Sequence, residues 1–372
     1  MLYVDHAATT PVRPGVAEAI APFLGDRFGN PSGIHDVSRQ AKDALEEARE
    51  RVAAVLGCQP LEVVFTGGGT EADNLALKGA ALAGGRRGGV VTVATEHEAV
   101  LESAHFLERM GCPVVILGVD EMGRVRPEEI VSEITEETAV VSVMWANNET
   151  GVIQPIGEIA DAVRSVNPAV RVHSDAVQAM VSEDVTSEAV DLLTVAGHKV
   201  GGPKGVGVLV VRDGTSLEPV VHGGGQELGR RSGTHNVAGA VGMAKALELA
   251  VADRERFRRD VGEARRRFEE TVGAKVSGVE SNAPPDRRLV QHSHIRIPGI
   301  RNETVLIRLD RMGVAASAGS ACQSGASSPS HVLTAMGLSP EAGRECLRFT
   351  FGWTTEPTDG DRLAEAVVEA VG

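Results

Sequence analysis

Short runs of valine, isoleucine and leucine alternate with longer amphipathic stretches between about residues 15 and 240. Such runs are typical of strands buried on both faces, and apolar positions recurring every three or four residues, as in 41–55, are typical of helices. The predicted strands are 63–65, 90–93, 114–117, 140–144, 170–172, 192–195 and 206–211. The alternation predicts an α/β fold whose large domain has a mainly parallel seven-stranded sheet covered by helices.

The pattern changes beyond about residue 245. Residues 247–270 form a predicted helix in which seven arginines alternate with acidic residues, the composition of a solvated, ion-paired face. A site for RNA or a partner is the alternative interpretation. Further strands are predicted at 291–297 and 314–317, and further helices at 330–336 and 358–371. We expect a large cofactor-binding domain, residues 15–250, and a smaller C-terminal α+β domain, residues 1–14 and 251–372.

Composition excludes several classes of protein. The 372 residues are 42% hydrophobic and 24% charged, which excludes a disordered or fibrous chain. A net charge of −14 argues against a broad nucleic-acid-binding surface. We find no targeting segment and no apolar run near the roughly 18 residues of a membrane span. The four scattered cysteines form no CxxC pair, so we expect a reducing, cytoplasmic location and no membrane partner.

Polar side chains follow five of the predicted strands at their carboxyl ends, where open α/β sheets bind ligands. They lie in residues 66–70, which include Gly69 and Thr70, in 95–97 with His97, in 147–148 with Asn148, in 173–178 with Asp175 and Gln178, and in 197–199 with His198 and Lys199. Five strand ends that deliver polar groups to one edge indicate a binding site. Taken singly, each has a structural explanation: a glycine turn without a ligand, an aspartate cap or a structural histidine.

Pyridoxal 5'-phosphate is a ligand that would use these groups together. A lysine condenses with its aldehyde, a carboxylate keeps its ring nitrogen protonated, a glycine-rich helix start holds its phosphate and a flat side chain covers its ring. Lys199, Asp175, residues 67–70 and His97 can fill these roles in turn. A dinucleotide, the alternative cofactor, leaves Lys199 and Asp175 without roles.

Residues 317–328 form a second candidate centre, because small polar residues and glycines surround Cys322 there. A thiol on such an exposed loop is a candidate nucleophile, whereas Cys58 and Cys346 have the apolar neighbours of structural cysteines. Arg348 alternates with apolar residues along a predicted strand. If it faces inward it would clamp a carboxylate, and an ordinary surface arginine is the alternative.

Together these motifs resemble those of cysteine desulfurases of the NifS/IscS type, in the class V aminotransferase group of fold-type I pyridoxal phosphate enzymes. The resemblance extends over essentially the whole chain, and the Ser-Ala-Cys loop is similar to that of the long-loop branch. The landmarks are residues 5–11 (DHAATTP), 29–32 (GNPS), 70–74 (TEADN), 95–97 (TEH), 147–151 (NNETG), 197–199 (GHK), 223–225 (GGG), 231–234 (RSGT) and 319–322 (GSAC).

The resemblance implies a role for each candidate residue and no metal. Lys199 would form the Schiff base, and Cys322 would receive the sulfur as a persulfide. Asp175 would pair with the ring nitrogen, Gln178 would donate a hydrogen bond to the phenolic oxygen, and His97 would stack on the ring and transfer protons. The phosphate would be bound by Gly69, Thr70 and His198, and by Thr234 from the other subunit of a homodimer. Asn148 and Arg348 would bind the substrate carboxylate.

The implied reaction removes sulfur from L-cysteine, releases L-alanine and passes the persulfide sulfur to an acceptor protein. One departure concerns Ala196, where relatives have a phosphate-binding serine; a hydrogen bond to a charged group contributes about 1.5–3 kcal/mol. A selenocysteine lyase, a class V transaminase and a scaffold without catalysis are the alternatives. Iron–sulfur clusters, tRNA thiolation, DNA phosphorothioation and metabolites are all open as destinations of the sulfur.

Overall fold

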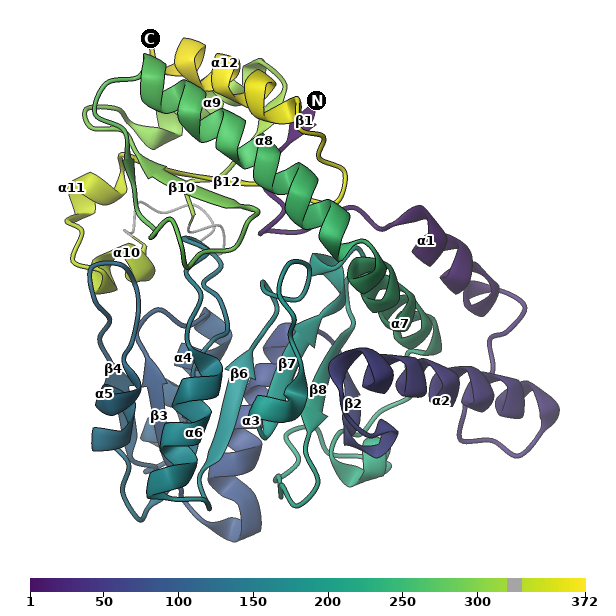
Figure 1. Ribbon diagram of the computed structural model, residues 1–372. Coiled ribbons are helices and arrows are strands. Elements are labelled where there is room, and N and C mark those ends of the chain that lie inside the picture. Colours follow the sequence, from purple (N-terminus) through teal and green to yellow (C-terminus); the bar gives the residue numbers. More distant parts are fainter. Residues whose placement is uncertain (320–329) are drawn as a thin grey trace.

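The protein is described by a computed structural model that covers residues 1–319 and 330–372. Within those residues a seven-stranded sheet forms the centre of the larger part of the chain (Figure 1), which confirms the predicted α/β fold. Six of its strands run in the same direction, and β8 runs in the opposite direction, antiparallel to both β2 and β7. In spatial order the strands are β2 (Val63–Thr66), β8 (Gly207–Val211), β7 (Leu192–Ala196), β6 (Arg171–Asp175), β5 (Thr138–Ser142), β3 (Gly89–Val93) and β4 (Val114–Leu117).

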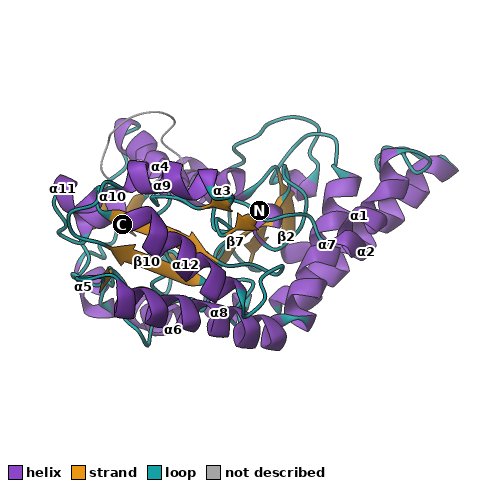
Figure 2. Ribbon diagram, turned by 90° about the horizontal axis from the view of Figure 1, so that it is seen from above, coloured by secondary structure: helices purple, strands orange, loops and turns teal. Residues whose placement is uncertain are grey.

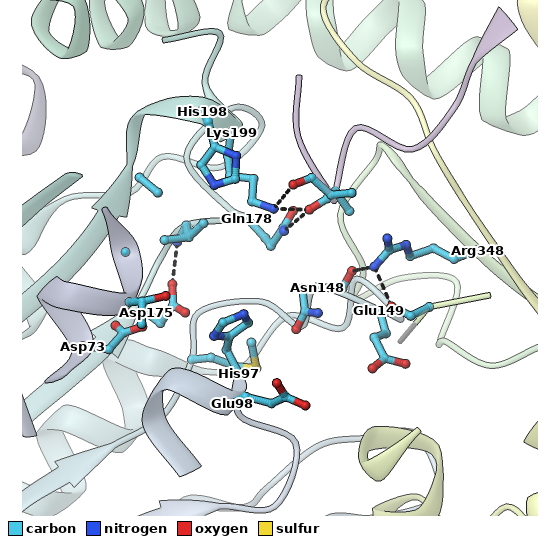
Figure 3. Close-up of a pocket in the computed structure, with 18 of the residues that line it drawn as sticks. Asp73, His97, Glu98, Asn148, Glu149, Asp175, Gln178, His198, Lys199 and Arg348 are labelled. Atoms are coloured by element: carbon cyan, nitrogen blue, oxygen red, sulfur yellow. Dashed lines mark hydrogen bonds between the residues drawn. The ribbon is translucent and has the colours of Figure 1, made fainter. Parts of the chain in front are cut away.

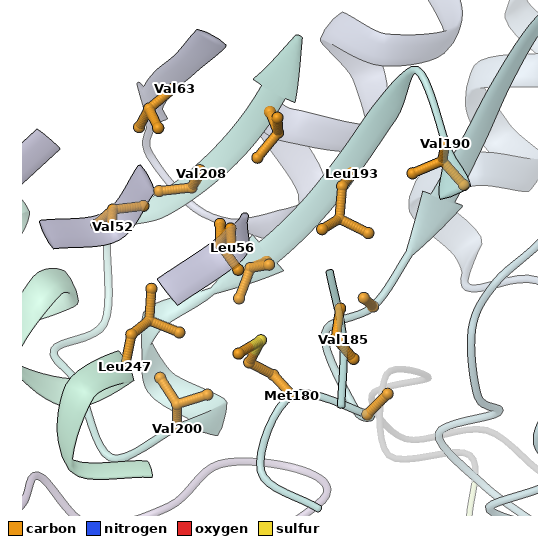
Figure 4. Close-up of a cluster of buried hydrophobic side chains, with 14 of the residues drawn as sticks. Val52, Leu56, Val63, Met180, Val185, Val190, Leu193, Val200, Val208 and Leu247 are labelled. Atoms are coloured by element: carbon orange, nitrogen blue, oxygen red, sulfur yellow. The ribbon is translucent and has the colours of Figure 1, made fainter. Parts of the chain in front are cut away.

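Helices cover both faces of this sheet because its strands are apolar on both sides. Val63 and Phe65 belong to the apolar cluster on one face, and Val64 between them belongs to the cluster on the other. The first face packs against α2 (Asp36–Leu56), α5 (Pro127–Ser132), α6 (Ile156–Val166) and α7 (Val237–Ala252), and the second against α3 (Gly69–Leu82) and α4 (Glu98–Arg109). Figure 2 shows α3 and α4 opposite α5 and α6. Figure 4 shows Leu56 of α2, Leu193 of β7 and Leu247 of α7 within one buried apolar cluster.

Two small sheets form the rest of the chain. One is antiparallel, with β12 (Cys346–Thr350), β10 (His292–Arg296) and β9 (Glu280–Ser281), and in the other β1 (Leu2–Tyr3) runs parallel to β11 (Val314–Ala315). Their helices are α8 (Arg254–Lys275), α9 (Asn302–Arg311), α10 (His331–Ala335), α11 (Pro340–Gly343) and α12 (Asp359–Val371), and α1 (Pro14–Ile20) packs on α7. Val4, Phe268 and Phe349 share a separate apolar cluster. This cluster supports the division into 15–250 and the remaining residues, which stays a proposal.

The predicted single helix over 247–270 is wrong, because α7 ends at Ala252 and α8 begins at Arg254. The buried side chains of α7 pack on the large sheet, whereas those of α8 belong to the cluster of the small sheets. The break therefore falls where the chain passes from one core to the other. The arginines of α8 form ion pairs, as when Arg266 contacts Glu263 and Glu270, which favours the solvated-face interpretation.

At the edge that concerns the site, two strand ends differ from the prediction by two residues or more. The strand predicted to end at residue 172 continues to Asp175, and the one predicted to end at residue 144 ends at Ser142. Polar residues such as His173 extend β6 because their side chains are hydrogen-bonded inside the sheet, here to Ser142 and Thr194. In the two described ranges, no helix combines the length and apolar character that a membrane crossing requires.

Candidate active site

A cavity of about 360 Å³ lies at the carboxyl ends of the sheet strands, with β12 of the small sheet on its other side (Figure 3). This volume is within the usual range for sites that bind small molecules. The structure brings nine of the predicted residues to its lining: Gly69, Thr70, His97, Asn148, Asp175, Gln178, His198, Lys199 and Arg348. They come from seven separate elements or loops, so the tertiary fold assembles the set.

Lys199 lies directly after β7, in the short 3-10 helix Gly197–Lys199. Its ammonium group donates hydrogen bonds to the carbonyl oxygens of Ala7 and Ala8, the latter at 2.8 Å. The amide of Gln178 donates to the same Ala7 oxygen at 3.0 Å. The N-terminal segment thus positions the lysine and the glutamine beside each other, a contact that the strand pattern does not predict.

Asp175 is the last residue of β6 and is 6% exposed. One carboxylate oxygen accepts a hydrogen bond from the Val177 N–H at 2.8 Å. Burial raises the pKa of Asp175 above its usual range, and the nearby His97 and Lys199 act in the opposite direction. A buried carboxylate in this position is stabilised by a cationic partner. The cavity wall therefore offers a site for a protonated ring nitrogen.

Asp73 is a second buried carboxylate in the same wall, and the sequence analysis missed it as a site residue. It lies on α3, and its side chain is 3.6 Å from the Nε2 atom of His173. Burial, and then the charge of Asp175, raise the pKa of Asp73. The only signal in the sequence is its place in the 70–74 landmark, three residues after Thr70.

The two histidines have structural contacts as well as places in the cavity. His97 caps the start of α4, where its Nδ1 accepts a hydrogen bond from the Ala99 N–H at 3.1 Å, and its ring projects into the cavity (Figure 3). The Nδ1 of His198 lies 3.2 Å from the Thr9 hydroxyl. Burial, followed by the charge of Lys199, lowers the pKa of His198 to about 4. His198 is therefore a neutral imidazole near pH 7, with one N–H to donate.

The glycine turn joins β2 to α3 at one end of the cavity. Gly69 and Thr70 line the cavity, and the first N–H groups of an α-helix lack partners inside the helix. Such a helix start favours an anion. Ala196 is packed against the turn, since a Cβ added at Gly69 would lie 3.5 Å from the Ala196 methyl group. Ala196 thus places a methyl group without a hydrogen-bond donor in the cavity lining beside the turn.

Arg348 is buried in the middle of β12, with a side chain 2% exposed, so the surface-arginine alternative is wrong. Its Nη2 donates to Asp5 at 2.8 Å, and its Nη1 donates to the carbonyl oxygens of Asn148 and Gly319, both at 3.0 Å. Within the described residues its Nε has no hydrogen-bond partner. The guanidinium therefore keeps donor capacity on the side of the Nε atom.

Glu149 is another cavity residue that the sequence analysis missed. It is 2% exposed, and it accepts a hydrogen bond from the Ser330 hydroxyl at 2.7 Å. Burial raises its pKa, although the Ser330 bond and the charge of Arg348 act against that shift. Its position next to Asn148 in the 147–151 landmark is the signal that could have found it.

Two predicted residues are not part of this cavity as the structure describes it. Thr234 is exposed and does not line the cavity of its own chain. Cys322 lies outside the described residues, and the residues that flank its segment, Gly319 and Ser330, both line the cavity. Burial raises the pKa of Cys58 and of Cys346 to about 11, which agrees with their interpretation as structural cysteines.

Comparisons with known proteins agree with this geometry. The family model for Aminotransferase class-V matches residues 2–363. A cysteine desulfurase IscS from Dictyoglomus turgidum is 42% identical over 361 residues, which cover 96% of this chain and 91% of that protein. A solved NifS-like protein superposes with a TM-score of 0.92 at 34% identity and covers 99% of this chain and 98% of its own. The structure of SspA in complex with cysteine superposes at 0.82 with 34% identity, over 94% and 99% of the two chains.

Proposed function

The chain belongs to the class-V aminotransferase family, and from this premise we propose that it is a pyridoxal phosphate-dependent cysteine desulfurase. Its substrate would be L-cysteine, and its products L-alanine and a persulfide on Cys322. The observation that carries the proposal is the meeting of Lys199, Asp175 and Arg348 in one cavity. An amine, a buried acid and a carboxylate-binding guanidinium are the groups that amino-acid chemistry on this cofactor requires.

The lining of the cavity supports pyridoxal phosphate as the cofactor. When bound, this group supplies an aldehyde that condenses with amines and a ring that accommodates negative charge from the substrate's α-carbon. Asp175 would hold the proton on the ring nitrogen, which would relieve the cost of its own burial. The other contacts that we propose are the phosphate with Gly69, Thr70 and His198, the phenolic oxygen with Gln178, and the ring face with His97.

Arg348 and Asn148 would bind the carboxylate of the substrate. The unpartnered Nε of Arg348 and a second N–H on its Nη2 are donors that point along one edge of a guanidinium, the geometry that matches a carboxylate. Asp5 and two backbone carbonyl oxygens hold the rest of the guanidinium. This fixed orientation would direct the substrate's α-carbon towards Lys199.

Lys199 would accept the proton from the α-carbon of L-cysteine, since its amine lies in the same cavity. The Cys322 thiolate would then attack the substrate's sulfur. A sulfur–sulfur bond forms as the bond from sulfur to the β-carbon breaks, and the electron pair of the broken bond stays with carbon. Protonation of the β-carbon, with His97 in reach as a proton carrier, completes the methyl group of alanine, and Lys199 would return the proton to the α-carbon.

A homodimer is our proposal for the assembly. Three large apolar side chains in the segment before α2 are strongly exposed: Leu24 at 73%, Phe28 at 76% and Ile34 at 91%. A contact with a second subunit would bury such apolar surface. The exposed Thr234 would reach the phosphate in the partner's cavity, and a separate acceptor protein would receive the persulfide sulfur.

Reconstitution with pyridoxal phosphate and L-cysteine tests the proposal. We expect cofactor absorbance, alanine release and a persulfide on the protein. Cys322→Ser should keep the absorbance and accumulate no persulfide, and a fully active Cys322→Ser protein would contradict the scheme. A comparison of cysteine with selenocysteine turnover separates a selenocysteine lyase, and a requirement for a keto acid as amino acceptor separates a transaminase.

A further inference from the structure

An ion pair lies behind the glycine turn, outside the cavity lining. Arg231 donates from Nε to one oxygen of Glu71 at 2.7 Å and from Nη2 to the other at 3.2 Å. The second oxygen also accepts the Gly67 N–H at 2.9 Å. The two side chains are only 23% and 26% exposed. One carboxylate therefore joins the loop of Arg231 to the turn that we assign to the phosphate.

Glu71 occupies a position that competes with a phosphate. It lies in the first turn of α3, directly after Thr70, and a carboxylate there is attracted to the same helix start that binds anions. Two anions at one helix start repel each other. Without a compensating cation, the Glu71 charge would weaken phosphate binding.

Arg231 supplies that cation with a fixed geometry. Its two-pronged contact is the strongest arrangement between a guanidinium and a carboxylate, and its hydrogen bond to Glu71 raises the pKa of Arg231. The loop around it is anchored. The Ser232 N–H donates to the Val221 oxygen at 3.1 Å, and Glu227 accepts the N–H of Phe65 in β2 at 3.1 Å. The loop that carries Arg231 thus contacts both elements that flank the glycine turn, β2 on one side and α3 on the other.

We propose that Arg231 is a positioning residue for the phosphate subsite. It holds Glu71 against Gly67 and neutralises its charge, so that the N–H groups of Gly69 and Thr70 are left to the cofactor phosphate. The inference rests on the proposed function, because it assumes that this turn binds the phosphate. Thr234, three residues later on the same loop, serves the partner's phosphate in that proposal, so one loop supports both sites of the dimer.

The test compares pyridoxal phosphate with pyridoxal, which lacks the phosphate, in absorbance titrations of the cofactor-free protein. Arg231→Gln should weaken pyridoxal phosphate binding about tenfold and pyridoxal binding less than about twofold, because only the phosphate meets the uncompensated Glu71. Glu71→Gln should bind pyridoxal phosphate as tightly as the unaltered protein or more tightly. The double variant should regain most of the affinity that Arg231→Gln loses.

Arg51→Gln is the matched control. Arg51 forms a similar two-pronged pair with Glu248, with both contacts at 2.6 Å, between α2 and α7 and away from the cavity. It should leave both dissociation constants unchanged.

Three results would overturn the inference. The first is an equal loss of affinity for pyridoxal phosphate and for pyridoxal in Arg231→Gln, and the second is a double variant that binds pyridoxal phosphate no more tightly than Arg231→Gln. The third is weaker pyridoxal phosphate binding by Glu71→Gln than by the unaltered protein. This third measurement decides the question even if Arg231→Gln folds poorly. Failure of the unaltered protein to bind pyridoxal phosphate would instead overturn the proposed function.

Discussion

The wall of the cavity at the large sheet and the wall at β12 present their polar groups in different ways. On the large-sheet side, Asp175 ends a strand and Lys199 and His97 follow strands, so local chain order brings each of them to the sheet edge, where the carbonyl oxygens of Ala7 and Ala8 then hold the Lys199 ammonium group. On the other side, Arg348 is in the middle of β12 and depends on Asp5, which is 343 residues away in the sequence. The half-buried Lys199 can therefore change with a smaller effect on the fold than the fully buried Arg348, which combines binding with folding.

The largest effect that we expect comes from Lys199→Ala, on the large-sheet wall. Turnover of L-cysteine should fall by about 10³-fold or more, because the amine that handles the α-proton is lost. The urea midpoint should change less than in Arg348→Lys, because the side chain of Lys199 is only half-buried and the change removes its hydrogen bonds to the Ala7 and Ala8 carbonyl oxygens but no buried charge pair. Alanine release and circular dichroism measure the two quantities.

Lys204→Ala is the control for this change, since Lys204 is exposed and does not line the cavity. It should retain turnover. If Lys199→Ala keeps more than a few per cent of the activity, the assignment of Lys199 is wrong.

Arg348→Lys should affect both activity and stability, and its effect on stability should exceed that of Lys199→Ala. A lysine keeps the charge but cannot reproduce the paired N–H donors with which a guanidinium binds a carboxylate. The KM for cysteine should therefore rise by about 100-fold. The loss of several buried hydrogen bonds should lower the free energy of unfolding by about 2–3 kcal/mol. Steady-state kinetics and urea unfolding measure these changes.

Arg296→Lys, at a solvent-screened ion pair of β10, should lower the free energy of unfolding much less than Arg348→Lys. An Arg348→Lys protein that loses no more stability than Lys199→Ala would remove the distinction between the two walls.

The pH dependence of stability should show the burial of a histidine on the β12 side. His294 in β10 is fully buried, and burial, followed by the charge of Arg348, lowers its pKa to about 3. Its folded-state pKa is below the unfolded value of about 6.5, so the stabilisation present above about pH 6.5 is lost as the pH falls towards 3.

The slope for this histidine approaches about 1.4 kcal/mol per pH unit. Urea unfolding of the unaltered protein and of His294→Gln from pH 7 to pH 5 isolates it, because other groups contribute equally to both proteins. The variant should lose less stability on acidification, and parallel curves would contradict the assignment.

The smallest effect that we expect is a gain at the glycine turn. Ala196→Ser should tighten pyridoxal phosphate binding by about tenfold, since a hydrogen bond to a charged group contributes at least about 1.5 kcal/mol. Pyridoxal binding should stay the same, because it lacks the phosphate. Absorbance titration with both ligands checks this, and an equal gain for pyridoxal would show that the hydroxyl acts elsewhere.

Local periodicity was sufficient for the large sheet and for the residues at its edge. The valine-rich runs predict all seven strands, because each strand is buried on both faces and so reads as a continuous apolar run. The positions of His97, Asn148, Asp175 and Lys199 follow from those strand ends. The break at Asp253 could not be predicted in this way, because it depends on which core each half of the helical stretch packs against.

By itself, then, the sequence determined the fold class, the sheet edge that carries the chemistry and the residue types found there, because these depend on neighbours in the chain. Only the tertiary structure decided that the backbone of Ala7 and Ala8 holds Lys199, that Asp73 and Glu149 are buried in the cavity wall, and that Arg231 pairs with Glu71. These features depend on segments that are far apart in sequence. The burial and pairing of a charged side chain are set by the segments that pack around it and not by its own neighbours in the chain.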